Sequence, residues 1–494
     1  MAINVVKRVI HKTQRDFAEV ALGQALGLLG NNPDKNVKYV LAAVDHFAKG
    51  EKEQVIRDWI RDWLAEGKPG RAFLGRMLTN THPNVRRRFI ARLIVKIFFN
   101  DRESAEQCER RYSFKPPQVM LISPTMRCNF RCQGCYAASY ERKDDMKPEV
   151  LDRVLGEAED IGVNFLVMLG GEPFVYPELL DVIKKHDKSF FQVYTNASLI
   201  DASMAKRLAK MGNIAPQVSV NGPAEYTDAS RGRGAFQQVM QAMDILREAG
   251  CVFGFSSLVT RDNIDALCTD KWFDLLVEKG ALYGWMFLYM PVGANPDPNL
   301  MPTPEQRNKL RLFIRHVRQT KPILPADFWS DGALTGGCIA GGRVYFHINH
   351  RGDVEPCIFC HFATHNINNC GLAEALASPF FADIKNGQPF SYNTLRPCPM
   401  IDHPEEMWKV IQRNQAKPTH EGAEQMFTTF APEIQRYALG VQEIMDEVWE
   451  KDGYSGWAPK WANVCEIPQE RIDSLHKAFL ESKNCTPVSK LPLC

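Results

Sequence analysis

Three cysteines near residue 130 have the spacing of a metal-binding loop. Cys128, Cys132 and Cys135 follow directly on a short apolar run, QVMLIS (118–123). Three thiolates in one tight loop can hold three irons of a cubane cluster, which leaves the fourth iron without a protein ligand. An open coordination position is typical of a catalytic centre rather than of an electron carrier. The spacing therefore predicts a catalytic iron–sulfur cluster that binds a small molecule on one iron.

A structural zinc loop is the alternative for the same cysteines. A closed zinc site needs a fourth protein ligand. The next histidine along the chain, His186, is distant in the sequence. The sequence therefore favours an iron–sulfur cluster over zinc at this loop.

A second group of cysteines lies in a Gly-rich stretch after residue 335. Thirteen residues separate Cys338 from Gly352, four more separate Gly352 from Cys357, and Cys398 follows much later. A cysteine in a Gly-rich hairpin, a second just beyond it and a third far along the chain can together form a buried site. These residues predict a second metal centre with four cysteine ligands.

The fourth ligand of this second centre has two candidates, Cys360 and Cys370, and we expect Cys360. A zinc ribbon is an alternative for the same residues, because zinc accepts similar cysteine sets. We interpret the nearby histidines as surface or hydrogen-bonding residues and the remaining cysteines as packing or incidental thiols. They are His347, His350, His361 and His365, and Cys108, Cys251, Cys268, Cys465, Cys485 and Cys494.

The elements that must position the first loop are strands alternating with helices. Short apolar runs separated by amphipathic stretches such as PEVLDRVLGEAEDIG predict six strand–helix units. The predicted strands are 118–123, 164–169, 190–195, 216–220, 252–259 and 284–290. Such units in series predict a parallel, barrel-like sheet whose active site lies at the carboxyl ends of the strands.

The residues before and after this region do not alternate between short strands and helices. Residues 1–112 carry apolar residues at helical spacing, whereas the stretch after residue 320 is rich in Gly and Cys. From about residue 405 the chain is again helical and rich in aromatic residues. We therefore expect four parts, namely 1–112, 113–325, 326–404 and 405–494.

The first loop resembles the signature of the radical S-adenosylmethionine (radical SAM) superfamily, C-x3-C-x2-C after the first strand of a partial barrel. Gly134 departs from the aromatic residue that many members carry, and Tyr136 follows directly. The second group resembles the SPASM or twitch extension, which implies one auxiliary 4Fe–4S cluster. The implied fold is α/β, a partial (β/α)6 TIM-like barrel with an all-helical N-terminal domain and a SPASM/twitch-like C-terminal cluster domain.

The resemblance also implies a set of cofactor-binding residues. The run Gly170, Gly171, Glu172 and Pro173 looks like the family motif that binds the amino group of S-adenosylmethionine. Glycines allow close backbone approach, and a carboxylate suits an ammonium group. By similarity, four residues at strand ends and one in the loop-to-helix segment beyond the fourth strand contact the ribose or the carboxylate of the cofactor. These are Thr195, Asn196, Ser219, Asn221 and Arg231.

The activity implied by the resemblance is reductive cleavage of S-adenosylmethionine to a 5′-deoxyadenosyl radical. That radical removes hydrogen from an unactivated C–H bond of the substrate, and an electron donor such as flavodoxin or ferredoxin supplies the electron. An auxiliary cluster in such an enzyme accepts an electron after hydrogen abstraction, or binds and orients the substrate. A non-catalytic electron carrier is the alternative from a different class.

The composition is that of an ordinary globular protein. Hydrophobic residues make up 45% of the chain, charged residues 24%, and the formal net charge is +2, which gives no global case for nucleic-acid binding. We expect no signal peptide at the start of this sequence, and no stretch approaches the roughly 20 apolar residues of a spanning helix. The expected location is the cytoplasm, with the inner membrane surface as an alternative.

The substrate is the least defined part of these expectations. Residues 85–99, VRRRFIARLIVKIFF, form a basic amphipathic run that could lie on an anionic membrane. A core-packing helix with a basic edge is the slightly preferred alternative. The membrane interpretation favours an apolar substrate, for example a lipid, with C–C bond formation as one outcome. Ribosomal-peptide maturation and tetrapyrrole modification are alternatives, although the all-helical N-terminus differs from a winged-helix peptide-binding module.

Overall fold

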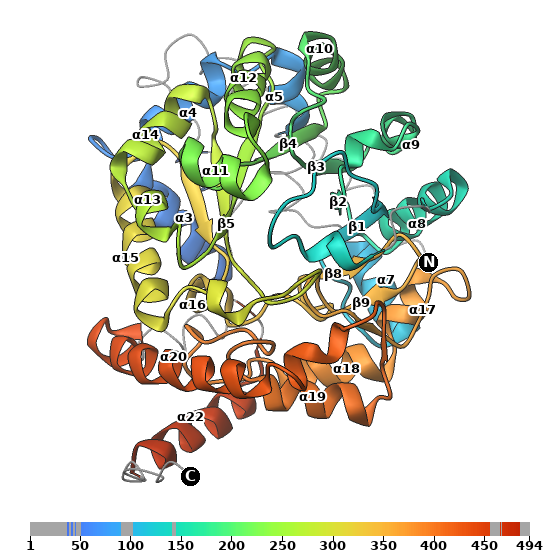
Figure 1. Cartoon of the computed structure of the whole chain (residues 1–494), viewed down its shortest axis with the longest axis vertical. Helices are drawn as coiled ribbons and strands as arrows, with labels where there is room; N and C mark the ends of the chain where they lie inside the picture. Colours follow the sequence, from blue (N-terminus) through green and yellow to red (C-terminus); the bar gives the residue numbers. More distant parts are fainter. Residues whose placement is uncertain are drawn as a thin grey trace.

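The structure is a computed structural model in which a parallel sheet carries helices on its outer side and a helical region packs below it (Figure 1). The described residues are 37, 38, 41, 42, 45, 51–89, 102–140, 145–454, 465 and 467–484. Cys485 and Cys494 lie outside them.

The six predicted strands all form, close to their predicted bounds. They are β1 (Val119–Thr125), β2 (Phe165–Gly170), β3 (Phe190–Thr195), β4 (Ile214–Ser219), β5 (Gly254–Val259) and β6 (Tyr283–Leu288). Each pairs in parallel with the next. Most of their residues are buried, as expected of strands covered on both faces. The predicted partial barrel is therefore confirmed.

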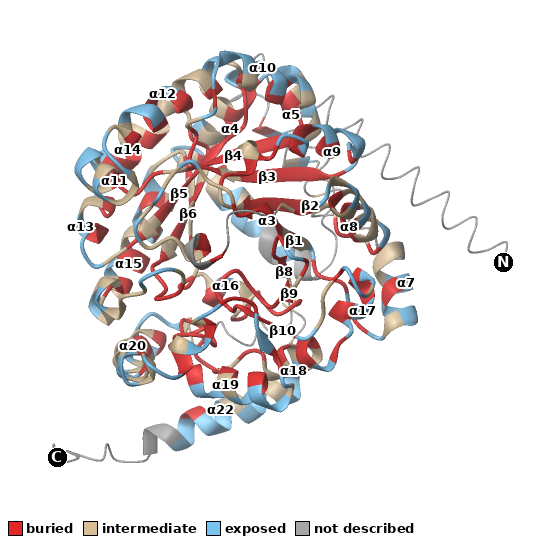
Figure 2. Cartoon of the chain, turned by 45° about the vertical axis from the view of Figure 1, so that its right-hand side comes forward, coloured by how far each residue is buried: buried red, intermediate tan, exposed pale blue. Residues whose placement is uncertain are grey.

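Amphipathic helices connect these strands and cover the outside of the sheet. They are α8 (Pro148–Asp160), α9 (Leu179–Lys185), α10 (Ala202–Met211), α11 (Ala224–Arg231), α12 (Ala235–Glu248), α13 (Ile264–Leu267), α14 (Asp270–Lys279) and α15 (Pro304–Thr320). In α8 the buried side chains recur at three- and four-residue spacing, as at Leu151, Val154 and Leu155. Figure 2 shows buried strands inside and exposed residues on the outer faces of the helices.

The sheet is larger than six strands. A seventh strand, β7 (Leu324–Asp327), pairs in parallel with β6. At the other edge β8 (Tyr345–Ile348) pairs in parallel with β1, and β9 (Val354–Glu355) pairs antiparallel with β8. The strand order is β7-β6-β5-β4-β3-β2-β1-β8-β9. These added strands are two to four residues long, too short for periodicity to reveal them.

The described ends of the chain are helical. Before the barrel lie α3 (Glu51–Trp63), α4 (Pro69–Thr79), α5 (Pro83–Phe89) and α7 (Arg102–Tyr112). After it come α16 (Gly332–Thr335), α17 (Leu372–Leu376), α18 (Pro379–Gly387), α19 (Pro404–Arg413), α20 (Ala431–Lys451) and α22 (Gln469–Asn484), with the short pair β10 (Phe362–Ala363) and β11 (Lys417–Pro418).

The basic run at 85–99 is described only through Phe89, which ends α5. The Phe89 ring lies 5.5 Å from that of Phe190 on β3, and Arg86 donates a hydrogen bond to the carbonyl of Leu78. This first turn therefore packs on the barrel. Residues 90–99 lie outside the described part, and membrane contact stays a prediction. Among the described helices, none has the length and apolar character required to span a bilayer.

Candidate active site

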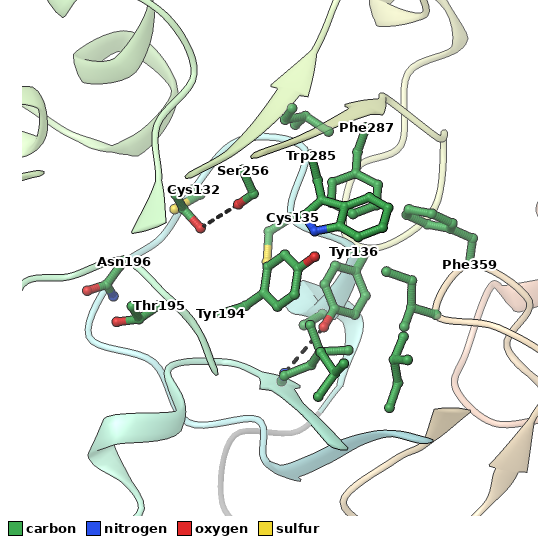
Figure 3. Close-up of a pocket in the computed structure, with 18 of the residues that line it drawn as sticks. Cys132, Cys135, Tyr136, Tyr194, Thr195, Asn196, Ser256, Trp285, Phe287 and Phe359 are labelled. Carbon is green, nitrogen blue, oxygen red and sulfur yellow. Dashed lines mark hydrogen bonds between the residues drawn. The ribbon is translucent and has the colours of Figure 1, made fainter. Parts of the chain in front are cut away.

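The first cysteine loop lies at the carboxyl end of β1, beside a cavity of about 260 Å³. Cys128, Cys132 and Cys135 all line this cavity, which we call the larger cavity because a second, smaller one lies beside it. Figure 3 shows two of these cysteines beside the strand-end residues. The loop ends in a 3-10 turn, η2 (Tyr136–Ser139). The predicted position, at the strand ends of a parallel barrel, is the one observed.

The thiols of this loop match the donor set of a cluster. All three are free, and each is partly buried. In a cubane held by three cysteines, each sulfur binds a different iron. Burial raises the pKa of Cys135 to about 11, so the thiolate form needs a positive partner such as iron.

Two glycines at the end of β2 let the strand pass against the cysteine loop. Gly170 has φ +113°, and a Cβ there would lie 2.1 Å from the carbonyl oxygen of Thr125. A Cβ on Gly171 would lie 2.1 Å from the carbonyl oxygen of Arg127. Both glycines line the larger cavity. Glycine is therefore required for packing onto the loop as well as for exposing backbone to a ligand.

Glu172 is fully buried, and its carboxylate accepts hydrogen bonds from neighbouring residues of the chain. One oxygen accepts from the Thr195 hydroxyl at 2.8 Å and from the Phe174 amide at 3.2 Å, and the other accepts from the Asn196 amide at 2.7 Å. Burial raises its pKa to about 7. Neither Glu172 nor Pro173 is among the residues lining the cavity. The contacts fit a residue that positions Thr195 and Asn196, and its binding to the cofactor's amino group stays a prediction.

The other predicted cofactor-binding residues all line the larger cavity, namely Thr195, Asn196, Ser219 and Asn221 at strand ends and Arg231 at the end of α11. The Asn196 side-chain amide lies 3.8 Å from the sulfur of Cys128. Arg231 donates to the Asn221 side chain at 3.4 Å, and its Nε is a buried donor with no hydrogen-bond acceptor among the described residues. An orphaned guanidinium N–H beside the cysteines fits the carboxylate of S-adenosylmethionine.

Most of the remaining lining is apolar and rich in aromatic residues, which the sequence did not lead us to predict. The Trp285 and Phe287 rings stack with centroids 6.1 Å apart, and Phe328 lies 5.2 Å from Phe287. Figure 3 shows Trp285, Phe287 and Phe359 beside Tyr136. On β6, half-buried residues alternate with buried ones. A signal was present, because alternate residues of the predicted strand GWMFLYM are large and aromatic.

The second cysteine group lines a smaller cavity of about 210 Å³. Cys338, Cys357, Cys360 and Cys398 all line it, whereas Cys370 does not. The Cys370 thiol instead donates to the carbonyl of Asn366 at 3.4 Å. The four cysteines preferred as ligands thus line one cavity. Residues that line both cavities separate this site from the first: Trp285, Phe328, Ile339, Tyr345 and Phe359.

A buried polar network joins the barrel to the second cysteine region. His347 on β8 contacts the Ser123 hydroxyl through Nε2 at 2.8 Å and the Glu355 carboxylate through Nδ1 at 2.6 Å. The Tyr140 hydroxyl donates to the same carboxylate at 2.9 Å. Burial alone would raise the pKa of Glu355, but hydrogen bonds from His347 and His361 outweigh it and hold the pKa well below its usual range.

His347 and His361 are hydrogen-bonding residues, as expected, but both lie in the core rather than at the surface. His350 is also buried. The sequence gives no signal for this network, because its members are far apart along the chain. Glu355 in particular is a single carboxylate with nothing around it in the sequence to set it apart.

Comparisons with known proteins agree with this geometry. A family model described as Radical SAM superfamily matches residues 122–267. The AdoMet-dependent heme synthase of Nitratidesulfovibrio vulgaris is 27% identical over 292 residues, covering 52% of this chain and 78% of that protein. Mycofactocin maturase MftC of Mycolicibacterium smegmatis is 31% identical over 270 residues, covering 51% of this chain and 67% of that protein.

Among solved structures, Streptococcus suis SuiB bound to precursor peptide SuiA superposes with a TM-score of 0.50 at 17% identity, covering 65% of this chain and 84% of that one. This likeness supports the fold alone. The matched model, the relatives and the cysteine loop agree on one family whose members are enzymes, so the electron-carrier alternative is set aside. The chain belongs to the radical SAM superfamily and is an enzyme that binds a 4Fe–4S cluster and S-adenosylmethionine.

Proposed function

We propose that this radical SAM enzyme removes hydrogen from an unactivated C–H bond in an uncharged, apolar part of its substrate. The lining of the larger cavity carries this proposal. Arg231 is the one Asp, Glu, Lys or Arg among the described lining residues, and its position suits the carboxylate of S-adenosylmethionine. The surface that remains for a substrate is mostly apolar and rich in aromatic residues, and it favours uncharged groups.

The proposed roles of the chain's residues follow from their positions. Cys128, Cys132 and Cys135 hold the cluster, and the backbone of Gly170 and Gly171 lies against the cofactor. When bound, the cluster and S-adenosylmethionine supply the one-electron chemistry that starts hydrogen abstraction. Arg231 orients the cofactor carboxylate. The aromatic side chains exclude water and hold the target C–H group in place.

A second metal centre is part of this proposal. Cys338, Cys357, Cys360 and Cys398 would hold an auxiliary 4Fe–4S cluster in the smaller cavity. Aromatic residues such as Tyr345 and Phe359 form the partition between the two cavities. An auxiliary cluster beyond this partition suits a role as electron acceptor in a net oxidation.

Two substrate classes fit, a peptide with apolar side chains and a tetrapyrrole. The relatives named above are a mycofactocin maturase and a heme synthase. The shortage of cations in the larger cavity favours the peptide, because tetrapyrrole carboxylates need positive partners. A lipid tail also suits an apolar lining, but no relative reported above is named for a lipid.

The test is anaerobic reconstitution with iron and sulfide, followed by dithionite and S-adenosylmethionine. We expect 5′-deoxyadenosine from the wild type and none from a Cys128/Cys132/Cys135→Ala variant. The variant should keep about four of about eight irons, as cubane ligation implies. Fully reconstituted wild type that makes no 5′-deoxyadenosine, even with soluble and membrane cell extracts added, would contradict the proposed function.

The apolar lining has its own test. Trp285→Arg places a cation in the larger cavity, so substrate-dependent 5′-deoxyadenosine formation should fall at least tenfold while the iron content stays at the wild-type level. Trp59→Arg is the matched control, because Trp59 is half exposed on α3, outside the cavity. Equal activity of the two variants would show that the aromatic surface does not receive the substrate.

A further inference from the structure

The guanidinium group of Arg343 is hydrogen-bonded to the backbone of Cys338, the first cysteine of the second site. Arg343 follows the Gly-rich turn between Cys338 and β8. Its Nε donates to the carbonyl of Cys338 at 2.8 Å, and its Nη2 donates to the carbonyls of Thr335 at 2.8 Å and Gly337 at 3.2 Å. All three acceptors belong to the segment that leads into Cys338, so the guanidinium has a fixed position next to this ligand.

Arg343 differs from the other arginines around this site in its partners. Arg307 pairs with Asp402 at 2.6 Å, and Arg396 pairs with Asp446 at 3.3 Å. Arg343 bonds instead to carbonyl oxygens and to the Cys465 thiol, and no carboxylate of the described residues lies within 4.0 Å of it. A half-buried guanidinium keeps its charge, and a charge removed from water is costly unless an anion balances it.

We propose that Arg343 supplies the positive charge that balances the auxiliary cluster and raises the reduction potential of that cluster. This inference rests on the second metal centre proposed above. A 4Fe–4S core with four thiolates is an anion, and each added electron makes it more negative. A fixed cation beside one ligand stabilises the reduced cluster more than the oxidised one. Reduction is a one-electron transfer from dithionite, and Arg343 keeps its proton throughout.

Charge and hydrogen bonding at Arg343 can be separated by substitution. Arg343→Lys retains the charge but not the planar fork that reaches several carbonyls. Arg343→Gln retains one donor group but not the charge. If Arg343 acts only as a clamp on the segment before Cys338, the two variants should behave alike. If it acts through charge, they should differ.

The experiment uses the full chain with Cys128, Cys132 and Cys135 changed to Ala, so that only the second cluster gives a signal. Reconstituted protein is titrated with dithionite under redox mediators, and the reduced cluster is followed by EPR. We expect Arg343→Gln to shift the midpoint potential downward with iron content unchanged. Arg343→Lys should stay near the parent value. Arg413→Gln, at an exposed arginine paired with Asp383 on α18, is the control for charge alone.

Three results would overturn the inference. The first is an unchanged potential in Arg343→Gln at full iron content, and the second is an equal shift in Arg413→Gln. The third is loss of cluster iron in both Arg343 variants, which would make Arg343 a clamp only. Failure of the proposed second centre is distinct from all three, because the parent protein would then contain zinc or no metal and would give no cluster signal.

Discussion

Glu172 combines complete burial with a full set of hydrogen-bond donors. Three donors hold its two oxygens at the junction of β2 and β3, so the ends of both strands are fixed relative to each other. Burial raises its pKa to about 7 in spite of these donors. The motif that suggested a cofactor ligand is thus also a structural element of the cavity wall.

The raised pKa of Glu172 predicts a specific pH dependence of stability. In the folded protein the carboxyl keeps its proton up to about pH 7, whereas the unfolded chain releases it near pH 4.5. The free energy of unfolding should therefore decrease as the pH rises from about 4.5 to about 7, by on the order of 3 kcal/mol. Glu172→Gln should remove this decrease, as urea unfolding of the metal-free protein at pH 5 and pH 8 would show.

Glu178→Gln is the control for this change, because Glu178 is exposed on the same segment. It should leave the pH dependence of the wild type intact. If Glu172→Gln retains the full decrease between pH 5 and pH 8, the carboxylate is not the group responsible.

The two candidates for the fourth auxiliary ligand give opposite expectations. Cys360 lines the smaller cavity, and Cys370 bonds to a backbone carbonyl elsewhere. Cys360→Ala should therefore lose much of the iron of the second site, whereas Cys370→Ala should keep it. Iron analysis and EPR after reconstitution would measure this, and iron loss in Cys370→Ala alone would reverse the assignment.

At the scale of secondary structure, β8 and β9 position Glu355 inside its network. Glu355→Ala would leave the Nδ1 of His347 without its acceptor and would remove one of the partners of the Tyr140 hydroxyl, in a site closed to water. Breaking a buried ionic network of this kind costs about 3–5 kcal/mol. Urea unfolding should show a loss of that size, and Glu406→Ala, at an exposed position on α19, should change stability by less than about 0.5 kcal/mol. A loss below about 1 kcal/mol in Glu355→Ala would contradict the role of the network.

Some strands of the sheet could be predicted from the sequence pattern and others could not. The six barrel strands are apolar runs between amphipathic helices, and β3 (Phe190–Thr195) matches its predicted range. The strands β7, β8 and β9 are short, and β1, the parallel partner of β8, lies far away along the chain. Local pattern contains no information on such pairing. The cysteines and strand-end residues follow apolar runs, so their position at the larger cavity could be predicted. The partition with Tyr345 and the network around Glu355 depend on distant pairing and could not be predicted.

At the scale of the whole molecule, a buried ion pair connects the barrel to the second cysteine site. Arg307 on α15 pairs with Asp402, both side chains being fully buried, and the Asp402 carboxylate accepts from the amide of Cys398 at 3.0 Å. Arg307→Met would leave Asp402 buried without a counter-ion, which costs several kcal/mol. We expect lower stability and loss of iron from the second site, with iron at the first site retained.

Arg315→Met is the matched control for Arg307→Met, because Arg315 lies on the same helix and is half exposed. Separate EPR signals of the two clusters would measure the effect. Equal iron in both variants would show that the ion pair does not support the Cys398 turn.

The pairing of β8 with β1 means that the barrel depends on residues that lie after residue 325. Four residue pairs, from Val119↔Tyr345 to Ile122↔Ile348, join the strand before the first cysteine loop to the region of the second. A barrel cut off after residue 325 would leave β1 as an apolar edge with unpaired N–H and C=O groups, a template for aggregation. The two cysteine regions thus share one sheet, so we expect removal of the second region to destabilise the barrel that holds the first.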